Sequence, residues 1–163
     1  MITLRASGGE RYDATIYACK HCKTIGFLID EDPGVEEIPV PMVDAEHLGT
    51  ILRFFEHRVE CLRDLLNDPS ASDEESLDET LMHILVNKSR AFLQPIETQE
   101  LLQLLMAANY LNCEVLIDLI ATVIAARISG KSRDEMRDIL GIENDFTEEE
   151  EAQIIAENSW AFA

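Results

Sequence analysis

The helical pattern in the last third of the chain limits the fold more than any other feature of the sequence. Between Leu116 and Ile128 apolar side chains recur at the three- and four-residue spacing of one helical face. Valine, isoleucine and alanine fill much of the remaining circumference. A helix that is apolar on nearly all sides must be covered on nearly all sides, by its own domain or by another chain. The pattern therefore predicts packing or recognition, and it leaves no room there for an active site.

Two capping boxes predict where later helices begin. In Ser132-Arg133-Asp134-Glu135 the serine can accept a backbone N–H while the glutamate reaches back to cover another, and Thr147–Glu150 repeats this arrangement. Gly130 and Gly141 stand where the preceding helices should stop, because glycine takes the left-handed conformation without steric cost. We therefore expect four helices with short connections from about Thr98 to Trp160.

The first half of the chain reads as a mixed α/β module. Alternating residues over Ile2–Ala6 and Tyr12–Ile16, separated by Ser7-Gly8-Gly9, predict a β-hairpin. Thr24–Ile29 is typical of a short apolar helix. The prolines of Ile38–Met42 favour an extended edge, because proline cannot donate to a strand ladder.

Asp44 begins the clearest amphipathic helix of the chain. Its apolar face comprises Leu48, Ile51, Leu52, Phe55 and Val59. Strands followed by packed helices predict an α+β domain. Residues 67–80, NDPSASDEESLDET, carry six acidic side chains and no basic one, and they can bury too little to offset the entropy of ordering them. We expect a disordered acidic loop there.

Composition narrows the class of partner. The chain has 163 residues and a net charge of −19, with 13 lysines and arginines against 32 acids. Nucleic acid and anionic membranes are therefore poor partners, whereas basic protein surfaces suit the charge. No apolar run is long enough to span a membrane and no secretory leader is evident. In a sequence without a membrane span or a readable leader, four cysteines predict reduced thiols in the cytoplasm or nucleus.

The residues that could carry chemistry favour no enzyme. Cys19-x-x-Cys22 is half of a zinc site, but no second pair with this spacing exists, so we expect neither metal nor cofactor. No phosphate-binding glycine loop or nucleophile arrangement is readable. The histidines at 21, 47, 57 and 83 fit solvated surface positions, and Glu148–Glu151 fit the start of a helix.

Several motifs stand in the order and spacing of one known family. They are Ala107–Leu111, Gly130–Ser132 with Glu135–Arg137, Asn144–Gln153 followed by Glu157-Asn158 and Trp160, and upstream Ile2–Ala6, Ser7–Glu10 and Pro39–Pro41. This pattern resembles the S-phase kinase-associated protein family, the small adaptors of cullin-based SCF ubiquitin ligases. The resemblance implies a BTB/POZ fold over residues 1–128 and C-terminal helices over 129–163 that complete an F-box-binding surface. It also implies a non-catalytic bridge between a cullin and F-box substrate receptors, in the cytoplasm and nucleus.

Carried over position by position, the resemblance implies two contact sets. The F-box set is Leu102, Leu105, Leu116, Leu119, Val123, Ile124, Ile128, Leu140, Ile142, Phe146 and Trp160. The cullin set is Pro39, Val40, Pro41, Asn109 and Tyr110. For Leu116, Val123 and Phe146, internal core is an equally good interpretation, whereas Trp160 near a polar end fits a partner contact or a lid better. Exposed groove residues also predict a mobile C-terminal tail or a weak homodimer when no receptor is bound.

The sequence departs from the family pattern in two places. The tryptophan-bearing segment before Phe92-Leu93 is missing, and Leu81–Arg90 resembles it poorly, which puts a standard set of receptors in doubt. Glu148 stands where some relatives have a modified proline, so that regulation is excluded at this position. Two alternatives stay open: an Elongin-C-like adaptor, which would lack the helices after Gly130, and a scaffold of a non-ligase assembly such as a kinetochore complex.

Overall fold

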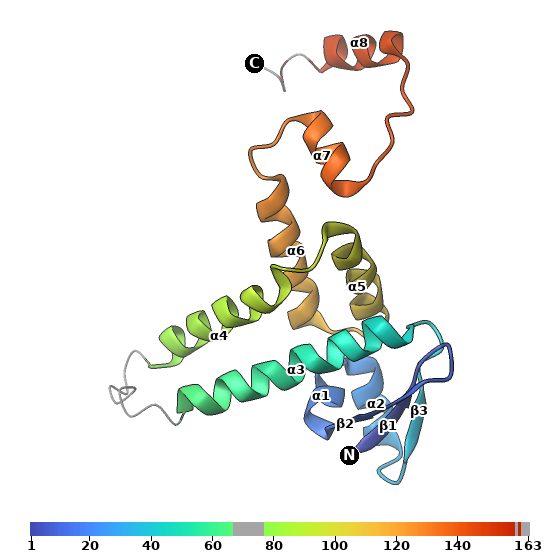
Figure 1. The fold of residues 1–163 in the computed structure, drawn as a ribbon, viewed down its shortest axis with the longest axis vertical. Coiled ribbons are helices and arrows are strands. Elements are labelled where there is room, and N and C mark those ends of the chain that lie inside the picture. Colours follow the sequence, from blue (N-terminus) through green and yellow to red (C-terminus); the bar gives the residue numbers. More distant parts are fainter. Residues whose placement is uncertain (67–76, 159, 161–163) are drawn as a thin grey trace. The chain divides into compact units, whose positions relative to one another are not determined.

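The computed structural model describes residues 1–66, 77–158 and 160, and it divides the chain into two units, Met1–Arg127 and Ile128–Ala163. The strands of the first unit are β1 (Ile2–Arg5), β2 (Arg11–Ala14) and β3 (Glu37–Pro39), in the order β2-β1-β3 (Figure 1). β1 pairs antiparallel with β2, opposing Leu4 to Tyr12, and parallel with β3, opposing Leu4 to Ile38. The predicted hairpin is confirmed, and the proline-bearing strand lies at an edge.

Helices make up the rest of the first unit. They are α1 (Ile16–His21), α2 (Lys23–Glu31), α3 (Ala45–Leu66), α4 (Leu77–Leu93), α5 (Thr98–Tyr110) and α6 (Glu114–Ile128). α3 contacts α1, α4, α5 and β2, so it organises the core, and α4 runs back alongside it (Figure 1). Leu48, Ile51, Leu52 and Phe55 of its predicted face are buried, while Val59 is half-buried. The sheet covered by helices confirms the predicted α+β class.

Two of these helices differ from the sequence prediction. Ile16 does not extend a strand; it begins α1, which Thr15 caps by accepting the backbone N–H of Ala18 at 3.2 Å. α4 begins at Leu77, so the last four residues of the expected acidic loop are helical. Residues 67–76 of that loop lie outside the described part of the chain.

Arg127 fixes the connection between α4 and α5 to the end of α6. Its guanidinium donates to the carbonyls of Gln94 at 2.8 Å and Ile96 at 2.7 Å, and to Thr98 Oγ1 at 3.0 Å. The charged guanidinium thereby supplies donors to two backbone carbonyls and one hydroxyl of this connection, and hydrogen bonds from a charged donor are the stronger kind. Across the described residues, no helix is both long and apolar enough to cross a membrane.

The second unit contains α7 (Arg133–Leu140) and α8 (Glu148–Glu157), which complete the four helices predicted after Thr98. Both predicted capping boxes are present, with Ser132 and Thr147 as the N-cap residues. Gly141 ends α7 at φ 64°, in the left-handed region that glycine adopts without strain. Neither helix has a buried residue. Local capping and polar contacts, and not a core of its own, therefore hold this unit in shape.

Candidate protein-interaction surfaces

The second unit presents large apolar side chains to solvent. The exposed fractions are 55% for Ile142, 48% for Phe146 and 78% for Trp160, and Leu140 is half-buried. Ile154 and Ile155 of α8 are exposed as well, although the sequence analysis did not select them. Ile142 and Phe146 lie in the connection between α7 and α8, and Trp160 follows α8. So much exposed apolar surface in a short segment is typical of a surface that a partner covers.

A single carboxylate links α7 to α8 within the second unit. Glu151 of α8 accepts hydrogen bonds from Arg137 at 2.9 Å and Arg133 at 3.3 Å, and from Asn144 at 3.0 Å. The Arg137 hydrogen bond, together with Asn144 and the charge of Arg133, lowers the pKa of Glu151. We call Glu151 and these three donors the Glu151 clasp. The clasp links the two helices that flank Ile142 and Phe146.

The F-box residues predicted on α5 and α6 divide by burial. Leu116, Leu119, Val123 and Ile124 are buried in the core, whereas Leu102, Leu105 and Ile128 are half-buried. For Leu116 and Val123 the structure places the side chain in the core, and for Phe146 it places the side chain in solvent. The apolar face of α6 is therefore largely used by internal packing in this form of the chain.

One of the predicted cullin residues, Tyr110, lines a groove of about 370 Å³ in the first unit. Tyr110 lines it from the end of α5, and Met42 and Val43 line it from the segment that follows Pro41. Pro39, Pro41 and Asn109 are exposed, while Val40 is buried. The Val40 backbone N–H continues the sheet by donating to Arg5 O at 2.7 Å. We call this groove and its rim the α5 groove.

Sequence reasoning missed the two most exposed apolar residues of the α5 groove. Met42 is 73% exposed and Met106 is 74% exposed, and both line the groove with Gln103. The spacing of Met106 and Tyr110 by four on one helix was the available signal, because residues four apart share a helical face. Methionine adapts its shape to a partner, which suits it to such a rim.

Asp44 and His47 form the floor of the α5 groove where α3 begins. The Asp44 carboxylate accepts from the backbone N–H of His47 at 2.9 Å and contacts His47 Nδ1 at 2.7 Å. These hydrogen bonds lower the pKa of Asp44 and fix the start of α3. His47 Nε2 is buried without a hydrogen-bond partner, which makes the imidazole part of the packed floor.

The start of α2 holds the turn that follows Tyr110. Thr24 Oγ1 donates to Tyr110 O at 3.2 Å, and the Thr24 N–H donates to Leu111 O at 3.2 Å. Lys23 pairs with Glu114 across the same turn, and Asn112 takes the left-handed φ of 54° that reverses the chain. The position of Tyr110 therefore depends on contacts with residues almost ninety positions earlier in the sequence.

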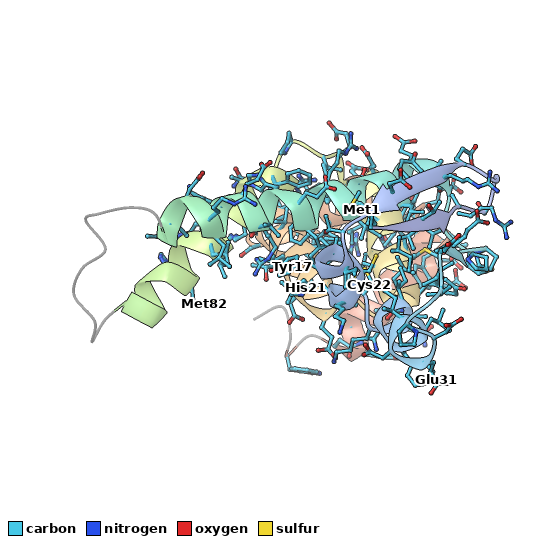
Figure 2. All side chains as sticks on the ribbon, turned by 90° about the horizontal axis from the view of Figure 1, so that it is seen from below. Met1, Tyr17, His21, Cys22, Glu31 and Met82 are labelled. Carbon is cyan, nitrogen blue, oxygen red and sulfur yellow. The ribbon has the colours of Figure 1, made fainter. Side chains whose placement is uncertain are left out.

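The prediction of solvated histidines is wrong for three of the four. His21 stacks on Phe55 with ring centroids 5.1 Å apart, and it lies beside Tyr17 (Figure 2). Burial, together with the charge of Arg58, lowers the pKa of His21. His47 and His57 are half-buried as well, whereas His83 is exposed. All four cysteines are buried free thiols, and the described residues contain no group of three or more metal-binding side chains.

Comparisons with known proteins match the chain as a whole. A family model described as "Skp1 family, dimerisation domain" matches residues 114–161. SKP1-like protein 14 of Arabidopsis thaliana is 35% identical over 99% of this chain and 96% of its own length. SKP1-like protein 13 of the same plant is 34% identical over 99% of this chain and 97% of its length. The similarity therefore covers both units, including the sheet for which the family model gives no match.

Proposed function

Because the chain belongs to the Skp1 family, we infer that it is the adaptor of an SCF-type E3 ubiquitin ligase, joining a cullin scaffold to F-box substrate receptors. The first unit has the BTB/POZ-like fold of that family. The observation that carries the conclusion is the match to SKP1-like proteins over nearly the full length of both partners. That match does not favour an Elongin-C-like adaptor or a non-ligase scaffold.

An adaptor of this kind positions its two partners and catalyses no reaction of its own. Holding a receptor and a cullin on one small protein raises the effective concentration of substrate near the ubiquitin-loading machinery. We propose accordingly that the chain has no enzymatic activity and works in the cytoplasm and nucleus, where such ligases operate.

The F-box surface that we propose uses the exposed residues of the second unit as its direct contacts. Ile142, Phe146 and Trp160 offer large apolar areas, and helix-in-groove recognition relies on such anchors. Leu140 of that unit is half-buried, as are Leu102 and Leu105 of α5, so each has a face to contribute. Leu116, Leu119, Val123 and Ile124 are buried and would act only by supporting the exposed faces of α5 and α6, and Ile128 at the end of α6 is half-buried.

The cullin surface that we propose is the α5 groove with its rim. Asn109 and Tyr110 lie at the end of α5, and Met42 and Met106 extend an apolar rim beside them. Pro39 and Pro41 are exposed next to it, and Val40 anchors the segment in the sheet. Tyrosine and methionine are enriched at interfaces because tyrosine buries a large ring while keeping a hydroxyl, and methionine adapts its shape to the partner.

One binding experiment tests the two surfaces together. Asn109→Lys with Tyr110→Lys should weaken cullin binding roughly tenfold or more and leave F-box binding intact, because charge and bulk enter one apolar rim only. Ile142→Asp with Trp160→Ala should do the reverse. Glu31→Lys is the control for the double lysine variant, since both raise the net charge by two and Glu31 is an exposed residue of α2.

Calorimetric titration with an F-box segment and with the amino-terminal part of a cullin measures the two affinities separately. If either folded double variant loses both partners, the separation into two surfaces is wrong. Sedimentation of the free chain adds a further measurement, since the exposed apolar residues of the second unit should give a weak homodimer that an F-box segment dissociates.

A further inference from the structure

Cys22 and Cys113 form a buried pair of thiols from distant parts of the first unit. Their sulfur atoms lie 2.9 Å apart, within hydrogen-bond distance, although the residues are separated by 91 positions. Neither side chain has any exposed surface. Figure 2 shows Cys22 within the first unit, at the junction of α1 and α2. A disulfide has an S–S length of about 2.05 Å, so the two sulfurs need to approach by only about 0.9 Å.

The backbones on either side of the pair are already fixed in register. The Lys23 N–H donates to Asn112 O at 3.3 Å, and Thr24 N–H donates to Leu111 O at 3.2 Å. The Cys113 N–H itself donates to Ala108 O at 2.9 Å, which holds the turn before α6 closed. A bond between the sulfurs would therefore follow contacts that the fold makes anyway, and it would need little backbone movement.

We propose that Cys22 and Cys113 are a site of oxidative modification, at which the two thiols close to an intramolecular disulfide. The oxidant is a small peroxide or a glutathione disulfide. Each sulfur gives up its proton and the pair gives up two electrons, forming one S–S bond. Hydrogen peroxide takes these electrons and protons and becomes two waters, whereas glutathione disulfide becomes two molecules of glutathione.

The sequence alone points to a different pair. Cys19-x-x-Cys22 has the spacing of a redox motif, and a disulfide between those two would lie within the α1–α2 junction. In the structure the close partner of Cys22 is Cys113. Both cysteines of the motif are buried, and burial raises the pKa of Cys19 to about 11. Geometry, and not the supply of thiolate, therefore favours Cys113 as the partner of Cys22.

The same burial sets the rate of the reaction. The hydrogen bond between the two thiols, followed by desolvation, raises the pKa of the Cys22 thiol, so thiolate is scarce in the closed structure. An oxidant must reach the sulfur during local opening of the turn at Leu111–Cys113. Oxidation should therefore be slow in buffer and faster in a urea concentration below the unfolding transition.

The disulfide would join α2 to the turn that follows Asn109 and Tyr110. It would stabilise the first unit because it closes a loop of about ninety residues in the unfolded chain, and long loops give the largest effect. This inference does not depend on the proposed function, because the bond and its effect on stability are measured without any partner.

The test uses the full chain incubated with glutathione disulfide, with and without mild urea. The intact mass should fall by about two mass units, and a non-reducing digest should contain a peptide pair joined through Cys22 and Cys113. The melting temperature should rise by roughly 5 °C or more, and dithiothreitol should reverse both changes.

Matched serine variants assign the bond. Cys19→Ser and Cys61→Ser should still form it, whereas Cys22→Ser and Cys113→Ser should not. If the last two fail to fold, the Cys19→Ser/Cys61→Ser double variant, which has only the proposed pair, gives the answer alone. A disulfide between Cys19 and Cys22, bonds only between molecules, glutathione adducts without an internal bond, or no reaction in mild urea would each overturn the proposal.

Discussion

Removal of the cap of α8 should weaken receptor binding by an amount that the structure sets. Thr147 Oγ1 accepts the Glu150 N–H at 3.3 Å, while Glu150 accepts from the Thr147 N–H at 2.9 Å. Thr147→Ala deletes the first bond and keeps the second. Water can reach this exposed site, so we expect a cost of about 1 kcal/mol, the usual value for such a cap. That cost lowers the ratio of folded to unfolded α8 about fivefold.

The effect on affinity follows from the length and exposure of α8. The helix has ten residues, none of them buried, and isolated helices shorter than about 12 residues are marginal in water. If α8 is formed in about half of the free molecules, a fivefold change leaves about one sixth competent, and the dissociation constant rises about threefold. If α8 is rarer than that, the rise approaches fivefold.

Titration of an F-box segment into the chain measures this change, with circular dichroism of the free chain as a second reading. Thr147→Ser keeps a hydroxyl at the cap and should bind as well as the original chain. Thr122→Ala is the matched control, because it removes an exposed threonine hydroxyl from α6. A loss of helicity with unchanged affinity would show that α8 is not part of the receptor surface. Unchanged helicity and affinity would refute the reasoning from the cap.

Two further predictions concern charge. The pKa of Glu151 is lowered chiefly by the Arg137 hydrogen bond. The clasp therefore contributes stability above the ordinary glutamate pKa and loses that stability as the pH falls below about 4.3. Helicity measured by circular dichroism should fall over that pH range, and it should fall less in Glu151→Gln. Ser89→Ala should destabilise the first unit by about 1–3 kcal/mol in urea unfolding. The buried Arg58 guanidinium donates to Ser89 Oγ at 2.8 Å and would lose that acceptor. A change in unfolding free energy within error would show that water replaces the hydroxyl.

Local signals predicted those elements whose stabilising contacts lie near in sequence. Both capping boxes, the stop at Gly141 and the hairpin depend on residues within a few positions of one another, and the structure confirms them. The helix that Asp44 begins was equally clear, because its apolar face repeats over about three turns, from Leu48 to Val59.

Elements whose pattern is broken by a polar residue were harder to predict. The core face of α4 includes Leu85, Ser89 and Leu93. The polar serine at its centre interrupts the apolar helical spacing, and only its hydrogen bond with Arg58 of α3 explains its place in the core. α1 has only six residues, too few to show a helical period. Contacts between distant segments, such as the Cys22–Cys113 pair, leave no mark in spacing at all.

The candidate surfaces were predicted only as far as residue type allows. The sequence identifies Ile142, Phe146 and Trp160 as apolar, but it cannot tell that these face solvent while Leu116 and Val123 are enclosed. That difference depends on which neighbours cover α6, which is a property of the folded unit. The methionine rim of the α5 groove was missed for the same reason.

Because neither α7 nor α8 has a buried residue, we expect receptor binding to be coupled to the ordering of the second unit. A receptor would supply the hydrophobic interior that those helices do not have, so part of its contact energy would go into ordering them. The measured affinity would then be smaller than the contact area suggests, and it would carry the heat-capacity change of a folding reaction. Receptors that cover similar areas could accordingly differ in affinity according to how much of α7 and α8 each one orders.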